Sequence, residues 1–216
     1  MDPDRQGLVP AVLERGRRFQ DYIEWALDAP MFLVLRGARI VPNTGQTFRD
    51  YFANGFEGER STMNDWLTHL NTMFPEVRLK KTLEVRGADS LPRDLFAALP
   101  ALWTGLLYDP QALDEADALV QTFGVSDLEA VRARIAAEAL LATWQRGTVG
   151  DVVEKVVAIA RGGLSRRARV DDRGVDESTF LVPLERLIAS RRAPADLLIA
   201  ASTEPRWSDR LKPVLL

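Results

Sequence analysis

A row of polar side chains between Glu76 and Arg86 carries the residue types best suited to chemistry. Every second position is polar, which gives two carboxylates, three cations and one hydroxyl: Glu76, Arg78, Lys80, Thr82, Glu84 and Arg86. Carboxylate oxygens are ligands that Mg²⁺ prefers, and cations stabilise the charge of a phosphoryl group during its transfer. The row therefore suits phosphoryl transfer from a nucleotide.

A β-strand would place these polar side chains on one face. The intervening positions are apolar with one exception: Val77, Leu79, Lys81, Leu83 and Val85. This alternation predicts a strand over 76–86 whose apolar face packs on a core. Lys81 interrupts the apolar face, which indicates a bulge or a division into two strands near Lys80 and Lys81. A solvated strand whose opposite charges pair along its length is the structural alternative to a site.

The composition excludes several classes of function. The 216 residues are 46% hydrophobic, which is enough for a core, yet no apolar run approaches the ~20 residues of a membrane span. A formal net charge of −3 gives no reason to expect nucleic-acid binding. The absence of cysteine excludes disulfides and thiol nucleophiles. The opening residues lack the apolar core of a signal peptide, so a cytoplasmic location is expected.

The apolar spacing elsewhere predicts helices and short strands. Helices are expected over 17–28, after Thr47, after a cap at Ser61 or Asn64, and over 99–108, 112–123, 128–144, 149–160, 180–189 and 194–201, with a hairpin from 31–35 and 38–41. Ser126 is the expected N-cap of one helix, and Gly162-Gly163 the expected stop of another. We therefore expect an α+β fold.

The sole histidine, His69, lies in a predicted helix, where a core or surface role is commoner than a catalytic one. It cannot form a histidine pair for zinc, and we assign it no role.

Several longer blocks of the sequence resemble the plant and proteobacterial type of glutamate–cysteine ligase. The blocks are 2–10, 22–31, 64–80, 83–89, 98–103 and 105–109. They follow the order of that family and cover most of residues 1–110, with weaker similarity towards the C-terminus. The resemblance implies part of a glutamine-synthetase-like antiparallel sheet with helices behind it. We expect a sheet-bearing catalytic-type region over 1–110 and a helical C-terminal region over 111–216, within one compact domain.

The resemblance also implies an activity and a set of site residues. Such ligases use ATP and Mg²⁺ to phosphorylate the γ-carboxylate of L-glutamate and then join it to the amine of L-cysteine, the first step of glutathione biosynthesis. By this resemblance Glu84 is a Mg²⁺ ligand, and Arg86 and Arg78 are catalytic cations near the transferring phosphoryl group. Arg78, Lys80 and Arg86 would contact the nucleotide. Arg5 would bind a substrate carboxylate.

Two departures from the family leave three hypotheses open. Ser90, Leu91, Pro92 and Arg93 stand where the family has two glycines and Pro-Trp, and the match begins in the middle of ligases about twice as long. The chain is then a ligase portion that needs a missing N-terminal half or partner subunit, a diverged ligase that accepts another amine, or an inactive truncated homologue that acts as an interaction module. An exposed strand edge or a large apolar patch would favour a missing half or a partner.

Overall fold

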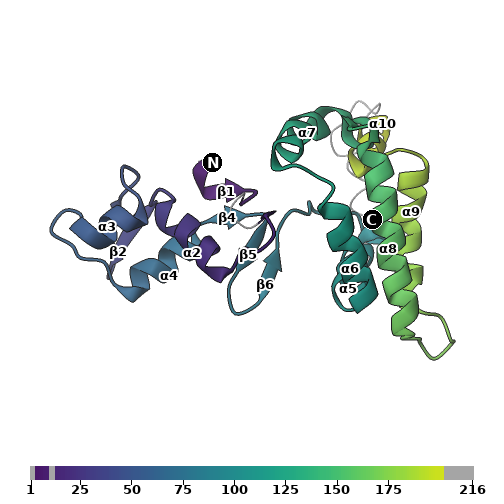
Figure 1. The fold of residues 1–216 in the computed structure, drawn as a ribbon, viewed down its shortest axis with the longest axis horizontal. Helices are drawn as coiled ribbons and strands as arrows, with labels where there is room; N and C mark the ends of the chain where they lie inside the picture. Colours follow the sequence, from purple (N-terminus) through teal and green to yellow (C-terminus); the bar gives the residue numbers. More distant parts are fainter. Residues whose placement is uncertain (1–2, 10–12, 202–216) are drawn as a thin grey trace. The chain divides into compact units, whose positions relative to one another are not determined.

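The computed structural model describes residues 3–9 and 13–201. The chain separates into two compact units, Met1–Asp89 and Ser90–Leu216 (Figure 1). This division falls earlier than the expected boundary at residue 110. The physical reason is that helix α5 (Ala98–Leu107) packs on helix α8 (Val149–Arg167), deep in the second unit.

The first unit alternates short helices with short strands. Its elements are η1 (Pro3–Arg5), β1 (Gln6–Gly7), α2 (Phe19–Asp28), β2 (Leu33–Arg36), β3 (Arg39–Pro42), α3 (Phe48–Asn54), α4 (Met63–Asn71), β4 (Phe74–Pro75), β5 (Val77–Leu79) and β6 (Leu83–Val85). One core cluster lies where the β2–β3 hairpin meets α3, and a second joins α2 to Met73. The expected α+β class is confirmed.

Helix N-caps explain where two of these helices begin. The hydroxyl of Thr47 accepts the backbone N–H of Asp50 at 3.1 Å, which confirms the expected cap of α3. The cap of α4 is Thr62, and the prediction of Ser61 or Asn64 was wrong. Thr62 and Asp65 form a reciprocal capping box, which fixes the start of α4 more firmly than either neighbour could.

The residues predicted as one strand over 76–86 form a hairpin. β5 and β6 pair antiparallel, with Arg78 opposite Glu84. The backbone N–H of Lys80 bonds to the carbonyl of Thr82 at 3.0 Å inside the turn. The division into two strands is therefore confirmed, and the single long strand was wrong. Because directly opposed residues share a face, the polar side chains remain together across the turn.

The apolar face of this hairpin does not pack on a core, contrary to the prediction. Val77 is 45% exposed and Leu83 is 64% exposed, whereas Arg78 on the polar face is only 8% exposed. Alternation separates two faces but does not say which of them the rest of the unit covers. Here Arg78, on the polar face, is the most deeply buried residue of the two strands.

The described strands form four separate two-stranded sheets. β1 pairs with β4 in parallel, while β2–β3, β5–β6 and β7–β8 are antiparallel; β7 (Thr143–Trp144) and β8 (Gly147–Thr148) belong to the second unit. Among the described residues no third strand pairs with β6. Two-stranded sheets are marginally stable in water by themselves, so the larger sheet that the resemblance implies is not complete here.

The second unit is mostly helical, as expected for the C-terminal region. Its helices, besides α5 and α8, are η2 (Arg93–Leu95), α6 (Pro110–Val120), α7 (Val125–Glu138), η3 (Ala139–Leu141), η4 (Glu177–Leu181), α9 (Val182–Ala189) and α10 (Pro194–Ala201). Its main core cluster joins α5, α8, η4 and α9. No helix within 3–9 and 13–201 is long and apolar enough to cross a membrane.

The expected helix stop at Gly162-Gly163 was wrong, because α8 continues through both glycines to Arg167. Gly163 lies against Gly105 of α5, and a methyl group on either glycine would collide with backbone oxygen on the other helix. Gly163 is therefore a close-approach residue. The expected cap at Ser126 was also wrong: the N-cap of α7 is Gly124, two residues earlier, and it makes no side-chain hydrogen bond.

Candidate functional site

A carboxylate held between two guanidinium groups is the main feature of the polar face of the β5–β6 hairpin. Nε and Nη2 of Arg78 lie 2.8 and 2.7 Å from Oε2 of Glu84. Nη1 of Arg86 lies 2.7 Å from Oε1 of the same carboxylate. The register of the hairpin creates this cluster, because it sets Arg78 opposite Glu84 and keeps Arg86 two residues further along the same face.

Arg78 also joins the hairpin to the C-terminal end of α4. Its Nη1 donates to the carbonyl of Asn71 at 3.0 Å and to the carbonyl of Met73 at 3.2 Å. The last carbonyls of a helix have no intrahelical partners and carry partial negative charge. Arg78 therefore satisfies backbone acceptors and a carboxylate with a single, nearly buried side chain.

Arg5, near the start of the chain, also binds the C-terminal end of α4. Its Nη2 donates to the carbonyl and to the hydroxyl of Thr72 at 2.9 and 2.8 Å, and its Nη1 donates to the carbonyl of Pro30. The residue is 6% exposed, and its guanidinium lies over the ring of Phe32. These partners of Arg5 do not include the Glu84 carboxylate. Substrate binding by Arg5 stays a prediction, and it would require Arg5 to exchange one of these acceptors for a ligand.

Arg86 and Lys80 are the more accessible cations of the row. The guanidinium of Arg86 lies 5.1 Å from the ring centre of Phe74, in a cation–π arrangement. Its side chain is 28% exposed, against 9% for Arg78. Lys80 is exposed in the turn between β5 and β6. The row therefore contains one nearly buried cation and two that solvent reaches.

The two arginines keep the Glu84 carboxylate ionised. Its pKa is lowered, first by the hydrogen bond from Arg78 and further by the hydrogen bond from Arg86, while desolvation opposes the shift. An ionised carboxylate is the form that binds cations. In this arrangement, both of its oxygens already accept from arginine.

The described residues do not provide a Mg²⁺ site by themselves. Within 3–9 and 13–201 no group of three or more histidine, cysteine, aspartate or glutamate side chains converges. Mg²⁺ prefers an octahedral set of oxygen ligands, and Glu84 offers one carboxylate that two guanidinium groups occupy. The arrangement instead suits recognition of an anion by cations, with Glu84 holding those cations in place.

The outer, apolar face of the hairpin borders a cavity of about 560 Å³. The cavity is lined by Arg17, Arg18, Phe19, Tyr22, Val77, Leu79 and Leu83. The hydroxyl of Tyr22 accepts the backbone N–H of Leu79 at 3.4 Å, at the outer edge of β5. This face is therefore apolar and partly open.

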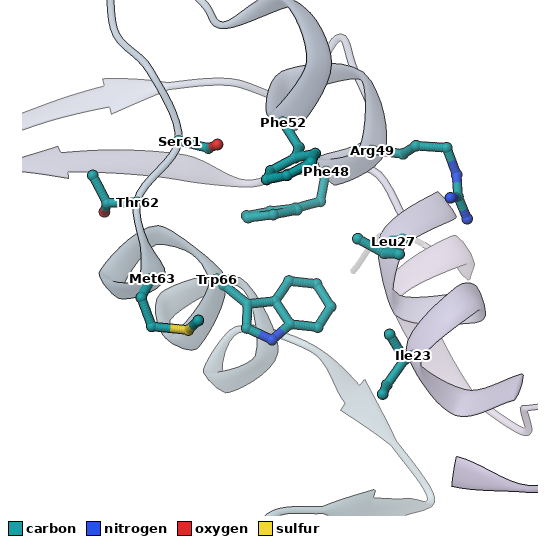
Figure 2. A pocket seen from close by; sticks show the side chains of 9 residues that line it. All are labelled: Ile23, Leu27, Phe48, Arg49, Phe52, Ser61, Thr62, Met63 and Trp66. Carbon is teal, nitrogen blue, oxygen red and sulfur yellow. The ribbon is translucent and has the colours of Figure 1, made fainter. Parts of the chain in front are cut away.

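A second apolar groove lies between α2, α3 and α4 (Figure 2). Its volume is about 440 Å³, and its lining comprises Ile23, Leu27, Phe48, Arg49, Phe52, Ser61, Thr62, Met63 and Trp66. The rings of Phe48 and Trp66 lie 4.8 Å apart at their centres. At the rim, Phe52 is 69% exposed and Met63 is 71% exposed. Exposed apolar side chains around a groove are typical of an interaction surface.

Sequence reasoning missed a second, partly buried ionic cluster. Arg36 donates to Asp65 at 2.7 Å, to Glu59 at 2.8 Å and to the hydroxyl of Tyr51 at 2.9 Å. Asp65 is 3% exposed and also belongs to the capping box of α4. The cluster ties the β2–β3 hairpin to α4. The signal in the sequence was the capping pattern at Thr62 and Asp65.

His69 lies in the core of the first unit. Its Nε2 is 2.8 Å from the carbonyl of Ala26, so Nε2 carries the hydrogen. Its ring stacks on Trp66 with centres 5.8 Å apart. Burial lowers its pKa to about 4. His69 is thus a neutral core residue, consistent with its omission from the candidate site.

The sequence matches one family of known proteins. The profile described as glutamate-cysteine ligase family 2 (GCS2) matches residues 1–213. The chain belongs to this family.

Curated plant proteins are similar along nearly the whole chain. Glutamate–cysteine ligase A, chloroplastic, of Oryza sativa subsp. indica is 36% identical over 216 residues, which cover 99% of this chain and 42% of the rice protein. The chloroplastic glutamate–cysteine ligases of Medicago truncatula and Arabidopsis thaliana are 37% and 35% identical, over 92% and 99% of this chain and 38% and 40% of their own lengths. The chain therefore spans about two fifths of the length of these relatives.

Proposed function

We propose that this chain supplies the hairpin part of the active site of an ATP-dependent glutamate–cysteine ligase. The observation that carries the proposal is the Arg78–Glu84–Arg86 cluster in a chain that belongs to the GCS2 family. The proposed substrates are ATP, L-glutamate and L-cysteine. The plant relatives carry the name glutamate–cysteine ligase, which supports this choice.

In the proposed reaction, a γ-carboxylate oxygen of glutamate attacks the γ-phosphorus of ATP and ADP leaves. The amine of cysteine then attacks the acyl carbon, and phosphate leaves as the amide forms and the amine loses a proton. Both steps move negative charge onto phosphoryl oxygens, where a guanidinium stabilises the transition state. Arg86 is the cation of the cluster best placed for this role, because it is partly exposed. Lys80, in the turn, is proposed to contact the nucleotide phosphates.

The proposed dependence on Mg²⁺ assigns Glu84 as one ligand, through Oε1, which Arg86 would have to release because both carboxylate oxygens accept from arginine in this structure. Since Glu84 is the only carboxylate in the cluster, further ligands are expected from the part of the ligase that corresponds to the remaining length of the relatives. A preceding half or partner subunit is therefore part of the proposal. A cytoplasmic location also stays a prediction; the relatives are named as chloroplastic proteins.

Calorimetric titration of the purified chain tests the nucleotide part of this proposal. Magnesium with a non-hydrolysable ATP analogue is added with and without glutamate, to the wild-type chain and to Arg86→Met. Saturable binding that Arg86→Met weakens is expected if the hairpin forms its share of the site alone. Equal binding by both chains would remove Arg86 from the nucleotide site.

A chimeric enzyme tests the ligase part. The matched region of the rice ligase is replaced by this chain, and formation of ADP and γ-glutamylcysteine is measured. Turnover that depends on cysteine supports the assignment. ATP-dependent turnover only with another amine would favour a diverged ligase, which the residues Ser90 to Arg93 suggest. A folded chimera that forms no amide would contradict both.

A second candidate function is an interaction module without catalysis. The observation that favours it is the exposed apolar groove between α2, α3 and α4 (Figure 2). In this hypothesis the groove binds a partner, and the charged β5–β6 hairpin is a remnant of an active site that no longer functions. A folded chimera that forms no amide, together with equal nucleotide binding by the wild-type chain and Arg86→Met, would favour this function over the first.

A further inference from the structure

The two arginines that hold Glu84 are fixed to very different degrees. The guanidinium of Arg78 makes bonds to Oε2 of Glu84 and to two backbone carbonyls at the end of α4, and its side chain is 9% exposed. The guanidinium of Arg86 makes one bond, to Oε1 of Glu84, and rests against the ring of Phe74.

The consequences of releasing each arginine differ accordingly. If the guanidinium of Arg78 moved away to bind a ligand, the Glu84 carboxylate and two backbone carbonyls would lose a nearly buried cationic donor, which is strongly unfavourable. If Arg86 left Glu84, a partly exposed ion pair would be replaced by contacts with solvent or ligand, and such pairs contribute little to stability. Only Arg86 can change partners at small cost.

We propose that Arg78 is a fixed positioning residue and that Arg86 is an exchangeable one. Arg78 holds Oε2 of Glu84 in place and does not touch the nucleotide. Arg86 leaves Oε1 of Glu84 and binds a phosphate oxygen when a polyphosphate reaches the hairpin. This inference rests on the proposed function for the presence of phosphate at the site, and it replaces the expectation that both arginines contact the nucleotide.

Side-chain ¹⁵N NMR of the intact 216-residue chain tests the division of roles directly. The Nε–H signals of the two arginines are assigned with Arg78→Lys and Arg86→Lys, and sodium tripolyphosphate is added. Sodium sulfate at equal ionic strength serves as the control for general anion effects. We expect the Arg86 signal to shift saturably with tripolyphosphate and the Arg78 signal to stay in place.

Three results would overturn the proposal. The Arg78 signal could shift as much as that of Arg86, the two signals could respond equally to sulfate, or neither signal could respond to millimolar tripolyphosphate. Because the titration contains no glutamate, cysteine or turnover, it can succeed while the ligase proposal fails, and the reverse also holds.

Matched charge variants give a second, independent measurement. Glu84→Gln removes the carboxylate charge that competes with phosphate for Arg86, so tripolyphosphate affinity is expected to rise about two- to fivefold, the range for release of one partly exposed ion pair. Glu76→Gln removes the same charge from the same face of the hairpin without breaking that bond, and less than half of this gain is expected. Equal gains in both variants would mean that general electrostatics, not exchange, controls binding.

A third comparison separates positioning from folding. Arg78→Lys keeps the buried charge but cannot hold Oε2 with two donors. The freed Oε2 is then available to Arg86, so tripolyphosphate affinity should fall below that of the wild type, and Glu84→Gln in the same chain should restore it. Loss of affinity without such rescue would assign Arg78 a direct contact with phosphate, contrary to the proposal.

Discussion

Two arginines distant in sequence meet the same helix end in the first unit. Arg5 binds Thr72, and Arg78 binds the carbonyls of Asn71 and Met73. Cations are favourable at a helix C-terminus, and buried carbonyls require donors. The pair therefore fixes the end of α4 and, through Arg78, the position of Glu84.

The neutral state of His69 predicts a pH dependence of stability. Its pKa is about 4 in the folded chain because burial disfavours the charged ring and Arg5 repels it, against about 6.5 in the unfolded chain. The unfolded state thus binds more protons between these values. The contribution of neutral His69 to the free energy of unfolding of the first unit is fully present above pH 6.5. It decreases as the pH falls towards 4, by up to about 3 kcal/mol.

Hydrogen exchange of amides in the first unit, measured between pH 6.5 and 4.5, checks this prediction. The variant His69→Gln removes the titration while it keeps an N–H that can donate to the carbonyl of Ala26. The wild-type opening free energy, corrected for intrinsic exchange, should fall with decreasing pH and that of the variant should not. Parallel slopes would show that other groups carry the acid sensitivity.

Glu84→Gln in the chimeric ligase is expected to lower kcat on the order of 100-fold, the scale of one lost charge-stabilising group in an active site. The substitution keeps an oxygen that can accept from Arg78 but removes the charge that the proposed metal role requires. Steady-state kinetics, with circular dichroism to verify folding, checks the result. Undiminished turnover would exclude a metal role for Glu84.

The sequence predicted which polar side chains share a face, but not their environment. Alternation predicted that Arg78, Glu84 and Arg86 lie on one face, and the register of the hairpin brings Arg78 opposite Glu84. It could not predict that Arg78 would be nearly buried, because the backbone carbonyls that it binds, at the end of α4 and just after it, leave no signature in residue types. The interactions of Arg5 with Pro30 and Thr72 were unpredictable for the same reason.

At the scale of elements, the sequence predicted which helices and hairpins exist, but it predicted their first and last residues less well. The helices α2, α3, α5 and α6 and the β2–β3 hairpin follow from apolar spacing and turn residues. The continuation of α8 through Gly162-Gly163 was not predictable from local preference. Glycine at a helix position is explained here by the approach of Gly105 from α5, which is a tertiary contact.

The two adjacent glycines of α8 allow a matched test of that contact. Gly163→Ala places a methyl group against the backbone of α5, and such overpacking costs about 1–3 kcal/mol. Gly162→Ala meets only the flexible end of Arg166, so the gain in helix propensity should stabilise by roughly 0.5–1 kcal/mol. Urea unfolding of both variants measures the difference. Equal effects would contradict close packing at Gly163.

At the scale of the whole molecule, long matched blocks of sequence are enough to identify the family. They do not tell how much of the active site this chain provides. A family resemblance transfers residue roles but not the ligands that lie elsewhere in a protein more than twice as long. The separate two-stranded sheets and the exposed apolar residues of the first unit support the proposal that a further half or partner subunit completes the site.

The groove between α2, α3 and α4 allows a test of whether further polypeptide covers the first unit in the complete ligase. In the isolated chain Phe52→Ser removes an exposed ring and should change stability by less than about 0.5 kcal/mol. If the groove is filled in the complete ligase, the same change should destabilise the chimera by about 1–3 kcal/mol, the value of burying a phenyl side chain. Urea unfolding of both proteins measures the contrast.

Phe96→Ser is the control, since Phe96 is similarly exposed, at 74%, and lies outside the groove. It should have the same small effect in both proteins. A small effect of Phe52→Ser in the chimera would mean that the groove stays open.

The indole of Trp66 forms part of the groove wall beside Phe48 (Figure 2). A tryptophan in that position emits light whose wavelength depends on the polarity around its ring. Any segment that covers the groove will displace water from the ring and move the emission to shorter wavelength. Occupancy of the groove can thus be read optically, without a label, once the emission of the other tryptophans has been subtracted.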